Sequence, residues 1–206
     1  MLALASAASA ATVGDILRTN YSDPYLLRDG ASRLVFPDPV TVETWGNPAA
    51  QEVAVPTIAQ WSLAGALPIR EGSKLVKFGT DPQVYAVGPG GTLHWIKTEE
   101  IAAALYGPAW NKNVVTLFSS FYQNYVVSAP VAAAAHPDGT LFKYAGAPTV
   151  YYLKNGVSRP FLNEIAFKAN RFSFRSVLTI PDAFQYVKGN WITGYEKELN
   201  WAIASL

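Results

Sequence analysis

The stretch LVKFGTDPQVYAVGPGGTLHWIKTEEIAAALYG, residues 75–107, contains the pattern that decides the fold. Residues 75–78 and 84–87 alternate along the chain as strand residues do, and Pro82 separates the two runs. GPGG at 88–91 predicts a hairpin turn, because glycine adopts positive φ at no steric cost. The stretch therefore begins with short strands joined by turns.

A short helix follows these strands. Thr98 supplies a hydroxyl cap, and Glu99 and Glu100 place acids in the first turn, near the positive end of the helix dipole. IAAALY at 101–106 continues the helix, and Gly107 ends it. The complete unit is predicted to run strand, strand, short helix, strand and a short helical turn.

The same pattern occurs three times, with a period of about sixty residues. Copy two starts at Gly72, copy one at Gly14 with GDILRTNYSDPYLLRDGASRLVFPDPVTVETWG, and copy three at Gly139 with GTLFKYAGAPTVYYLKNGVSRPFLNEIAFKANRF. The shared landmarks are a proline, a tyrosine, a turn glycine and a later aromatic residue: Pro24, Pro82 and Pro148; Tyr25, Tyr85 and Tyr151; Gly30, Gly90 and Gly156; Phe36, Trp95 and Phe161.

The second half of each copy matches as well. A β-branched run of strand character precedes an aromatic segment in each copy: 53–55 and 59–61, 114–117 and 122–125, 177–180 and 184–186. Asp38 with Pro39 opens the helix of copy one, and Gly46 ends it. Copy three departs from the pattern, because Asn170 and Arg171 stand where a Trp-Gly pair is expected.

The repeat predicts an α+β fold of three tandem diverged units, each a small antiparallel β-sheet with one short helix. The predicted segments are an apolar N-terminal segment 1–13, repeat 1 at 14–71, repeat 2 at 72–138, repeat 3 at 139–190 and a C-terminal tail 191–206. Side chains expected inside the units are Tyr85, Trp95, Val115, Tyr151, Phe161 and Leu178.

These motifs resemble a repeat family of secreted and cell-surface proteins from uncultivated small-genome bacteria. The resemblance rests on TDPQVYAVGPGGTLHWIKTEEIAAALYGPAWNKNVV at 80–115, GTLFKYAGAPTVYYLKNGVSRPF at 139–161 and FPDPVTVETWG at 36–46, and it covers nearly the whole chain. It implies an extracellular or cell-surface location, and it implies no established chemistry.

Composition narrows the function classes. The chain has 206 residues, a formal net charge of +1 and only 15% charged residues, so it offers no basic stripe for nucleic acid. Such low charge suits an assembly. The absence of cysteine excludes disulfides, thiolate metal sites and a cysteine nucleophile. No segment approaches the roughly 18 apolar residues of a membrane span.

The first residues, MLALASAASAAT, are apolar and then small. One interpretation is the remnant of a signal peptide, with Ala-Ser-Ala at 8–10 resembling a cleavage site. The other is an assembly arm, because an uncharged apolar segment that is ordered has to be buried, for example in a neighbouring subunit.

Catalytic chemistry is not indicated by the remaining polar residues. His94 lies in a strand pattern and His136 in a turn between copies, and two isolated histidines without a thiol do not specify a zinc site. Glu99 and Glu100 are adjacent on a helix, so they cannot face each other across a cleft as a glycosidase pair does. We expect no enzyme, no cofactor and no metal.

The tryptophans divide into core and surface candidates. Trp61 and Trp95 recur in other copies as Tyr or Phe, which is typical of core positions. Trp191 and Trp201 lie outside the repeat pattern, in the tail, where an indole ring can contact a subunit or stack on a sugar. The possible subunit or ligand contacts are Leu2, Leu4, Trp191 and Trp201.

Two function classes follow. The first is a structural protein of the bacterial cell envelope, a self-assembling subunit of an extracellular filament or surface layer, which the low charge, repeated units and apolar ends favour. The alternative is a secreted module that binds glycans or cell wall through exposed aromatic side chains.

Overall fold

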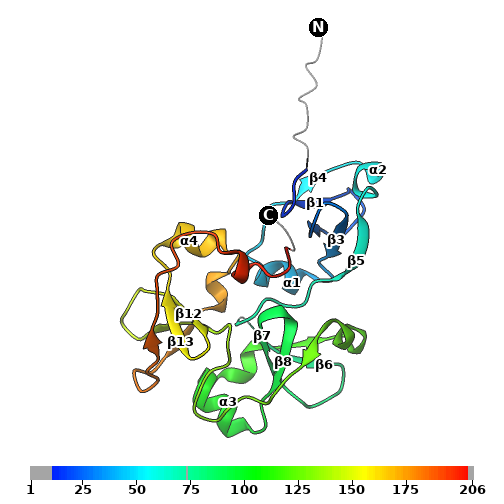
Figure 1. Cartoon of the computed structure of the whole chain (residues 1–206). Coiled ribbons are helices and arrows are strands. Elements are labelled where there is room, and N and C mark those ends of the chain that lie inside the picture. Colours follow the sequence, from blue (N-terminus) through cyan, green and yellow to red (C-terminus); the bar gives the residue numbers. More distant parts are fainter. Residues whose placement is uncertain (1–10, 73, 204–206) are drawn as a thin grey trace.

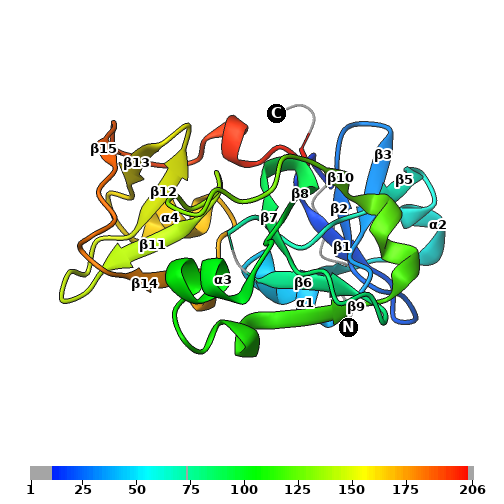
Figure 2. The ribbon, with the colours of Figure 1, turned by 90° about the horizontal axis from the view of Figure 1, so that it is seen from below.

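The computed structural model describes residues 11–72 and 74–203 and shows three lobes, one for each repeat (Figure 1). Each lobe is built on a five-stranded sheet carrying short helices, so the predicted α+β fold of three similar units is confirmed. Figure 2 shows the tail passing from the third lobe back toward the first.

The three sheets share one topology. Sheet one has the order β4-β1-β2-β3-β5, sheet two β9-β6-β7-β8-β10 and sheet three β14-β11-β12-β13-β15. The strands of sheet one are β1 (Ile16–Arg18), β2 (Tyr25–Leu27), β3 (Ser32–Val35), β4 (Gln51–Glu52) and β5 (Ser62–Ala66). Those of sheet two are β6 (Leu75–Phe78), β7 (Tyr85–Gly88), β8 (Thr92–Trp95), β9 (Val114–Leu117) and β10 (Val126–Val127). Those of sheet three are β11 (Leu141–Tyr144), β12 (Tyr151–Lys154), β13 (Val157–Pro160), β14 (Leu178–Ile180) and β15 (Val187–Lys188).

The central three strands of every sheet are antiparallel, as the hairpin turns predict. The two outer strands differ from the antiparallel sheet that the sequence predicts. Each pairs in parallel with its neighbour, as β9 does with β6 and β10 with β8. In each repeat, the segment between the third strand and the first edge strand to follow it in the chain carries the main α-helix. These crossovers let the chain cover both faces of a sheet within one repeat.

One α-helix follows the third strand in every repeat: α1 (Pro39–Thr44), α3 (Glu99–Tyr106) and α4 (Glu164–Ala169). The caps are Asp38, Thr98 and Asn163, whose side chains accept backbone N–H bonds of 2.8, 3.3 and 2.9 Å. The shorter helices are α2 (Val55–Ile58), η1 (Pro89–Gly91), η2 (Trp110–Asn113), η3 (Ser119–Asn124), η4 (Phe174–Ser176) and η5 (Lys197–Leu199).

The structure shifts part of the register read from the sequence. Tyr25, Tyr85 and Tyr151 each begin the second strand, as aligned. Pro24, however, directly precedes its tyrosine, whereas Pro82 and Pro148 stand three residues before theirs. Backbone bonds Phe36 N to Pro24 O, Ile96 N to Val84 O and Phe161 N to Val150 O make Ile96, and not Trp95, the counterpart of Phe36 and Phe161.

A one-residue shift matters because neighbouring strand residues face opposite sides of a sheet. Each sheet has one hydrophobic cluster on the side of its main α-helix and another on its opposite side. Phe161 lies on the helix side of sheet three and is buried, while Trp95 is half-buried on the opposite side of sheet two. The other expected interior residues, Tyr85, Val115, Tyr151 and Leu178, are buried or half-buried in these clusters.

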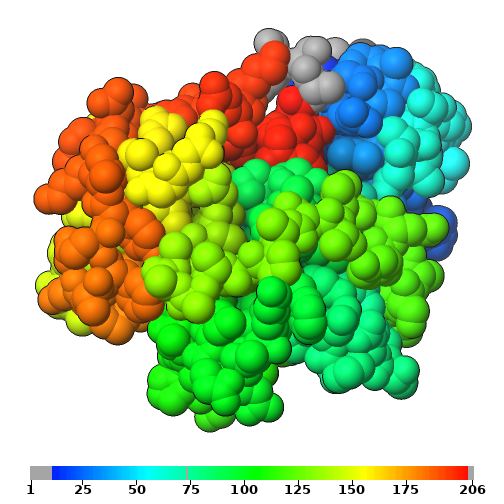
Figure 3. Space-filling view, turned by 60° about the horizontal axis from the view of Figure 1, so that its bottom comes forward, coloured from blue at the N-terminus to red at the C-terminus, as the bar shows by residue number. Residues whose placement is uncertain are grey.

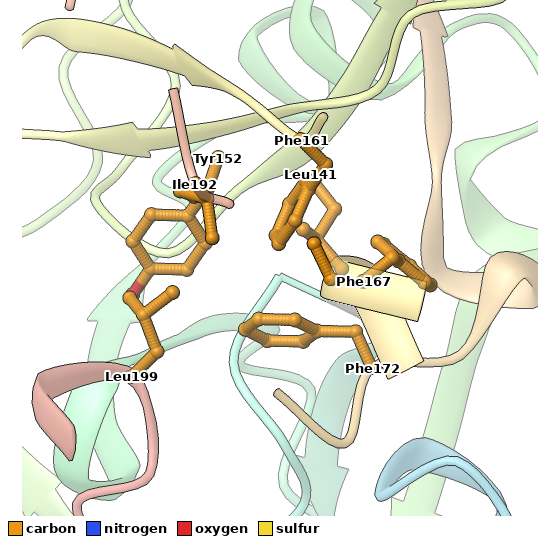
Figure 4. Packing of buried hydrophobic residues seen from close by; sticks show 8 residues of the cluster. Leu141, Tyr152, Phe161, Phe167, Phe172, Ile192 and Leu199 are labelled. Carbon is orange, nitrogen blue, oxygen red and sulfur yellow. The ribbon is translucent and has the colours of Figure 1, made fainter. Parts of the chain in front are cut away.

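The C-terminal tail joins repeat 3 to repeat 1. Ile192 and Leu199 complete the helix-side cluster of repeat 3, which Figure 4 shows from close by. Ala202 and Ile203 enter the helix-side cluster of repeat 1. In Figure 3 the red atoms of the tail fill the space between the blue first repeat and the yellow third repeat. The tail thereby closes the three repeats into one body.

A buried arginine lies where repeats 1 and 3 meet the tail. The guanidinium of Arg70 stacks between the rings of Trp45 and Phe172, at 4.3 and 4.4 Å from their centroids. It donates hydrogen bonds to Asn170 O, at 3.0 Å, and to Leu199 O. Burial lowers the pKa of Arg70, and the adjacent charge of Glu71 opposes that shift. The cation thus contacts repeat 1, repeat 3 and the tail at once.

None of the helices in the described part of the chain is long and apolar enough to cross a membrane.

We predict that Phe161→Ala lowers the free energy of unfolding by about 3–5 kcal/mol, because the ring is buried between Phe167 and Phe172. Phe118→Ala is the matched control, since the Phe118 side chain is 75% exposed and its loss should cost less than about 0.5 kcal/mol. Urea unfolding followed by tryptophan fluorescence measures both. Equal effects of the two substitutions would show that Phe161 is not part of the core.

Candidate functional site

His94 lies on β8 and is half-buried. Its Nδ1 is 2.8 Å from the carbonyl of Ala129, and its Nε2 is 3.3 Å from Oγ1 of Thr92. These contacts tie the imidazole to the segment that follows β10. The His94 ring therefore helps to hold the segment after β10 against β8.

His136 lies in the loop between repeats 2 and 3, where the sequence places it, but it is buried. Its Nε2 is 2.7 Å from the carbonyl of Leu105, and its Nδ1 is 2.7 Å from the hydroxyl of Tyr186. The ring also packs edge-on against Phe184. Burial lowers the pKa of His136, and the bond to Leu105 O opposes this shift. This histidine joins repeats 2 and 3.

The acidic residues of α3 take the place expected of them at the helix N-terminus. Glu99 and Glu100 form the first turn, and a hydrogen bond with Thr98 lowers the pKa of Glu100. Within residues 11–72 and 74–203, no three His, Cys, Asp or Glu side chains gather closely enough to hold a metal ion.

Repeats 2 and 3 carry cavities at equivalent positions. The cavity of repeat 3 has a volume of about 360 Å³ and is lined by Pro148, Thr149, Val150, Phe161, Leu162, Asn163, Glu164, Phe167, Phe174 and Trp191. The cavity of repeat 2 has a volume of about 250 Å³ and is lined by Pro82, Gln83, Val84, Trp95, Ile96, Lys97, Thr98, Glu99, Ala102 and Trp110.

The repeated topology explains why the two cavities coincide. One wall is the segment that enters the second strand, with Pro82 in repeat 2 and Pro148 in repeat 3. The floor comes from the link between the third strand and the main helix, where the capping residue and the first helical glutamate stand in both repeats. An aromatic residue from the 3-10 helix that follows, Trp110 or Phe174, forms the last wall. We call these two cavities the repeat pockets.

The repeat pocket of repeat 3 is largely aromatic. Phe167 and Phe174 stack with ring centroids 4.3 Å apart, and Trp191 is 54% exposed at the rim. Asn163 and Glu164 supply the polar part of the lining, and the Glu164 carboxylate is 2.5 Å from Nζ of Lys168. An apolar floor with a few polar groups is typical of small-molecule sites.

The repeat pocket of repeat 2 has the same position and a more polar character. Lys97 stands in place of Leu162, and Ala102 in place of Phe167. Gln83 lies at the entrance, where its Oε1 accepts a hydrogen bond of 2.5 Å from the hydroxyl of Tyr85. The half-buried indole of Trp110 remains available as a flat apolar face.

The residues predicted as contacts have different positions. Trp191 lies at a repeat pocket, as a ligand contact would. Trp201 instead packs edge-on against Trp45, and its Nε1 donates a 3.0 Å hydrogen bond to Glu71. Leu2 and Leu4 lie outside the residues that the structure describes. The pocket residue Phe174 was not foreseen, because nothing in its local sequence marks a cavity wall.

No protein-family model and no curated protein matches this chain.

We predict that stability falls as pH decreases below 6.5, the ordinary pKa of histidine. In that range the unfolded chain takes up a proton that folded His136 does not, so protonation favours unfolding. The His136→Asn variant should be less stable at pH 7 and lose this pH dependence between pH 7 and 5.5, whereas His94→Gln should retain it. Urea midpoints across this range measure the effect. An unchanged slope in His136→Asn would refute the assignment to His136.

Proposed function

We propose that this chain is a non-catalytic, secreted or cell-surface protein that binds glycans through the repeat pockets of repeats 2 and 3. The observation that supports this proposal is the recurrence of the pocket at the same place in two repeats, with an aromatic wall each time. Sugar rings present an apolar face, which stacks on an exposed indole, and hydroxyls, which bond to polar groups at a rim.

Two pockets on one rigid body suit a polymeric ligand. If both bind segments of one chain, the second contact is intramolecular, and the overall affinity can exceed that of either pocket. The replacement of Leu162 by Lys97 and of Phe167 by Ala102 makes the two pockets chemically different. We therefore expect the ligand to be a glycan chain that presents chemically different groups to the two pockets.

The described lining of each pocket contains one carboxylate, Glu99 in repeat 2 and Glu164 in repeat 3. Glycoside hydrolysis ordinarily uses two carboxyl groups on opposite sides of one scissile bond. A lining with a single carboxylate supports binding in preference to hydrolysis.

We predict that Trp191→Ala weakens glycan binding by about tenfold or more, because it removes the exposed stacking face of the repeat 3 pocket. Isothermal titration with chitotetraose, cellotetraose and xylotetraose measures the affinity. Trp110→Ala should act similarly at the other pocket. Tyr21→Ala is the matched control, since Tyr21 is 89% exposed and lines neither pocket.

Two results would contradict the proposal. One is the absence of binding to all three oligosaccharides. The other is an equal loss of binding in Trp191→Ala and Tyr21→Ala, which would mean that the pocket is not the contact.

The structural role in a filament or surface layer is the second candidate, and a different feature favours it. The last strand of every sheet is an edge strand, and each exposes large apolar side chains: Leu63 on β5, Val126 and Val127 on β10, and Val187 on β15. Exposed apolar edge strands pair readily with strands from other chains. The N-terminal segment 1–13 is uncharged and apolar, and we propose that its residues 1–10 supply the strand for this pairing, because Ala11 and Val13 pack within repeat 1.

Deleting residues 1–10, which keeps Ala11 and Val13 in the clusters of repeat 1, should abolish any polymers formed by the full chain while leaving the far-ultraviolet circular dichroism unchanged. Negative-stain microscopy of concentrated protein measures this. Val187→Lys, which places a charge on an exposed edge, should have the same effect, because charged edges resist pairing. Polymers that persist after both changes would refute this second role.

A further inference from the structure

A further cavity lies between repeats 1 and 3, and its lining shares one residue, Phe174, with the repeat 3 pocket. Its volume is about 630 Å³, which is within the usual range of ligand sites. Repeat 1 contributes Gly14, Asp15, Trp45 and Gly46, and repeat 3 contributes Lys168, Arg171, Ser173 and Arg175, with Tyr195 from the tail. We call this cavity the closure cleft, because it exists only where the tail brings repeats 1 and 3 together.

The lining of the closure cleft is positively charged. Lys168, Arg171 and Arg175 all line it, against one carboxylate, that of Asp15. Oδ2 of Asp15 already accepts hydrogen bonds of 2.8 and 3.1 Å from the backbone N–H and hydroxyl of Thr12. The cleft therefore has an excess of cationic side chains.

Arg171 is the central cation of this set. It occupies a left-handed backbone position, with φ of 59°, where repeat 1 has Gly46 with φ of 84°. Its Nη2 donates a 2.6 Å hydrogen bond to the carbonyl of Gly14. Within the described residues its guanidinium forms no ion pair with a carboxylate. Most of its five N–H donors are thus left for a ligand.

Burial lowers the pKa of Arg171, and the positive charge of Arg70 lowers it further, while Tyr195 and the carboxylate of Asp15 oppose these shifts. Among the described residues, the Asp15 carboxylate does not approach Arg171 closely enough to form an ion pair. A cation held near another cation and away from water is destabilised unless an anion compensates it. An anionic ligand in the cleft would supply that compensation.

The other two cations are held by weak contacts. Nζ of Lys168 is 2.5 Å from Glu164, and Nη1 of Arg175 is 3.5 Å from Glu43. The side chains of Lys168, Glu164 and Arg175 are more than half exposed, and exposed ion pairs contribute only about 0–1 kcal/mol. Both cations can therefore turn to a ligand at small cost.

We infer that the closure cleft is a binding site for an anionic group, a carboxylate or phosphate carried on a sugar-sized ligand. Trp45 and Phe172 give the cleft an apolar wall, and Tyr195 and Ser173 supply hydroxyls beside the three cations. Guanidinium groups bind carboxylate and phosphate oxygens through paired, charge-assisted hydrogen bonds. The inference rests on this charge arrangement and does not depend on the glycan binding proposed for the repeat pockets.

Titration calorimetry of the full chain at pH 7 tests the site, with tetragalacturonate as the carboxylate probe and inorganic phosphate as the phosphate probe. The methyl ester of tetragalacturonate is the uncharged reference. Binding of either anion, with at least about tenfold weaker binding of the methyl ester, supports the site, and the probe that binds identifies the source of the charge. Binding should weaken as NaCl is raised, because salt screens these charges.

Lys168→Gln with Arg175→Gln should weaken anion binding by about tenfold or more. Lys112→Gln with Lys188→Gln is the matched control, because it removes the same charge from exposed lysines outside the cleft. Arg171→Gly, which suits the left-handed backbone, should weaken binding further. Trp191→Ala should leave anion binding unchanged, which separates this site from the proposed glycan pockets.

Three outcomes would overturn the inference: neither anion binds, the methyl ester binds as well as the acid, or the control pair weakens binding as much as the cleft pair. Far-ultraviolet circular dichroism of each variant confirms that the comparison is made between folded proteins.

Discussion

The guanidinium of Arg70 joins repeat 1 to repeat 3 and the tail. Its flat faces contact Trp45 of repeat 1 and Phe172 of repeat 3, and its Nη2 reaches Leu199 O in the tail. Glu71, which pairs with it at 3.5 Å, accepts the indole N–H of Trp201. Removing one partner of a buried ion pair costs about 3–5 kcal/mol, because the other charge stays desolvated. A contact of that size helps hold the first and third sheets together, although each sheet alone has little core to bury.

The third repeat differs from the first at the residues that contact this centre. Where repeat 1 ends its helix with Trp45 and Gly46, repeat 3 has Asn170 and Arg171. The buried amide of Asn170 accepts from Glu196 N and Asn200 Nδ2 and donates to Ala166 O and Gly194 O, so it fixes the tail. Arg171 bonds to Gly14 O across the junction. The deviation from the repeat pattern is therefore the device that lets a linear array close on itself.

The sequence predicted what depends on local chemistry. Thr98, Asp38 and the turn glycines specify caps and hairpins through neighbouring residues alone, and these elements are confirmed. The parallel edge strands could not be predicted, because they depend on which strands pair in space. The counterpart of Phe161 was misassigned for a related reason. Trp95 and Ile96 are both apolar, so the alternation of side chains along a strand does not show which of them faces the helix. Trp191 was a candidate contact because it lies outside the repeat; it lines the repeat 3 pocket, and a contact with a ligand stays a prediction. The pocket itself was not predicted, because its walls come from segments far apart in the chain.

Closure also determines what the chain can bind. Trp191 stands immediately before Ile192, whose N–H donates to Pro160 O at 2.8 Å and whose carbonyl accepts from Leu162 N at 3.0 Å. These two bonds fix the start of the tail against the third sheet, and with it the indole that forms the rim of the repeat 3 pocket. The same tail, farther on, places Tyr195 in the closure cleft. Both sites therefore use side chains that the returning tail supplies. A ligand stabilises the state that presents its complete site. Binding at either site should thus favour the arrangement in which the tail packs between repeats 3 and 1.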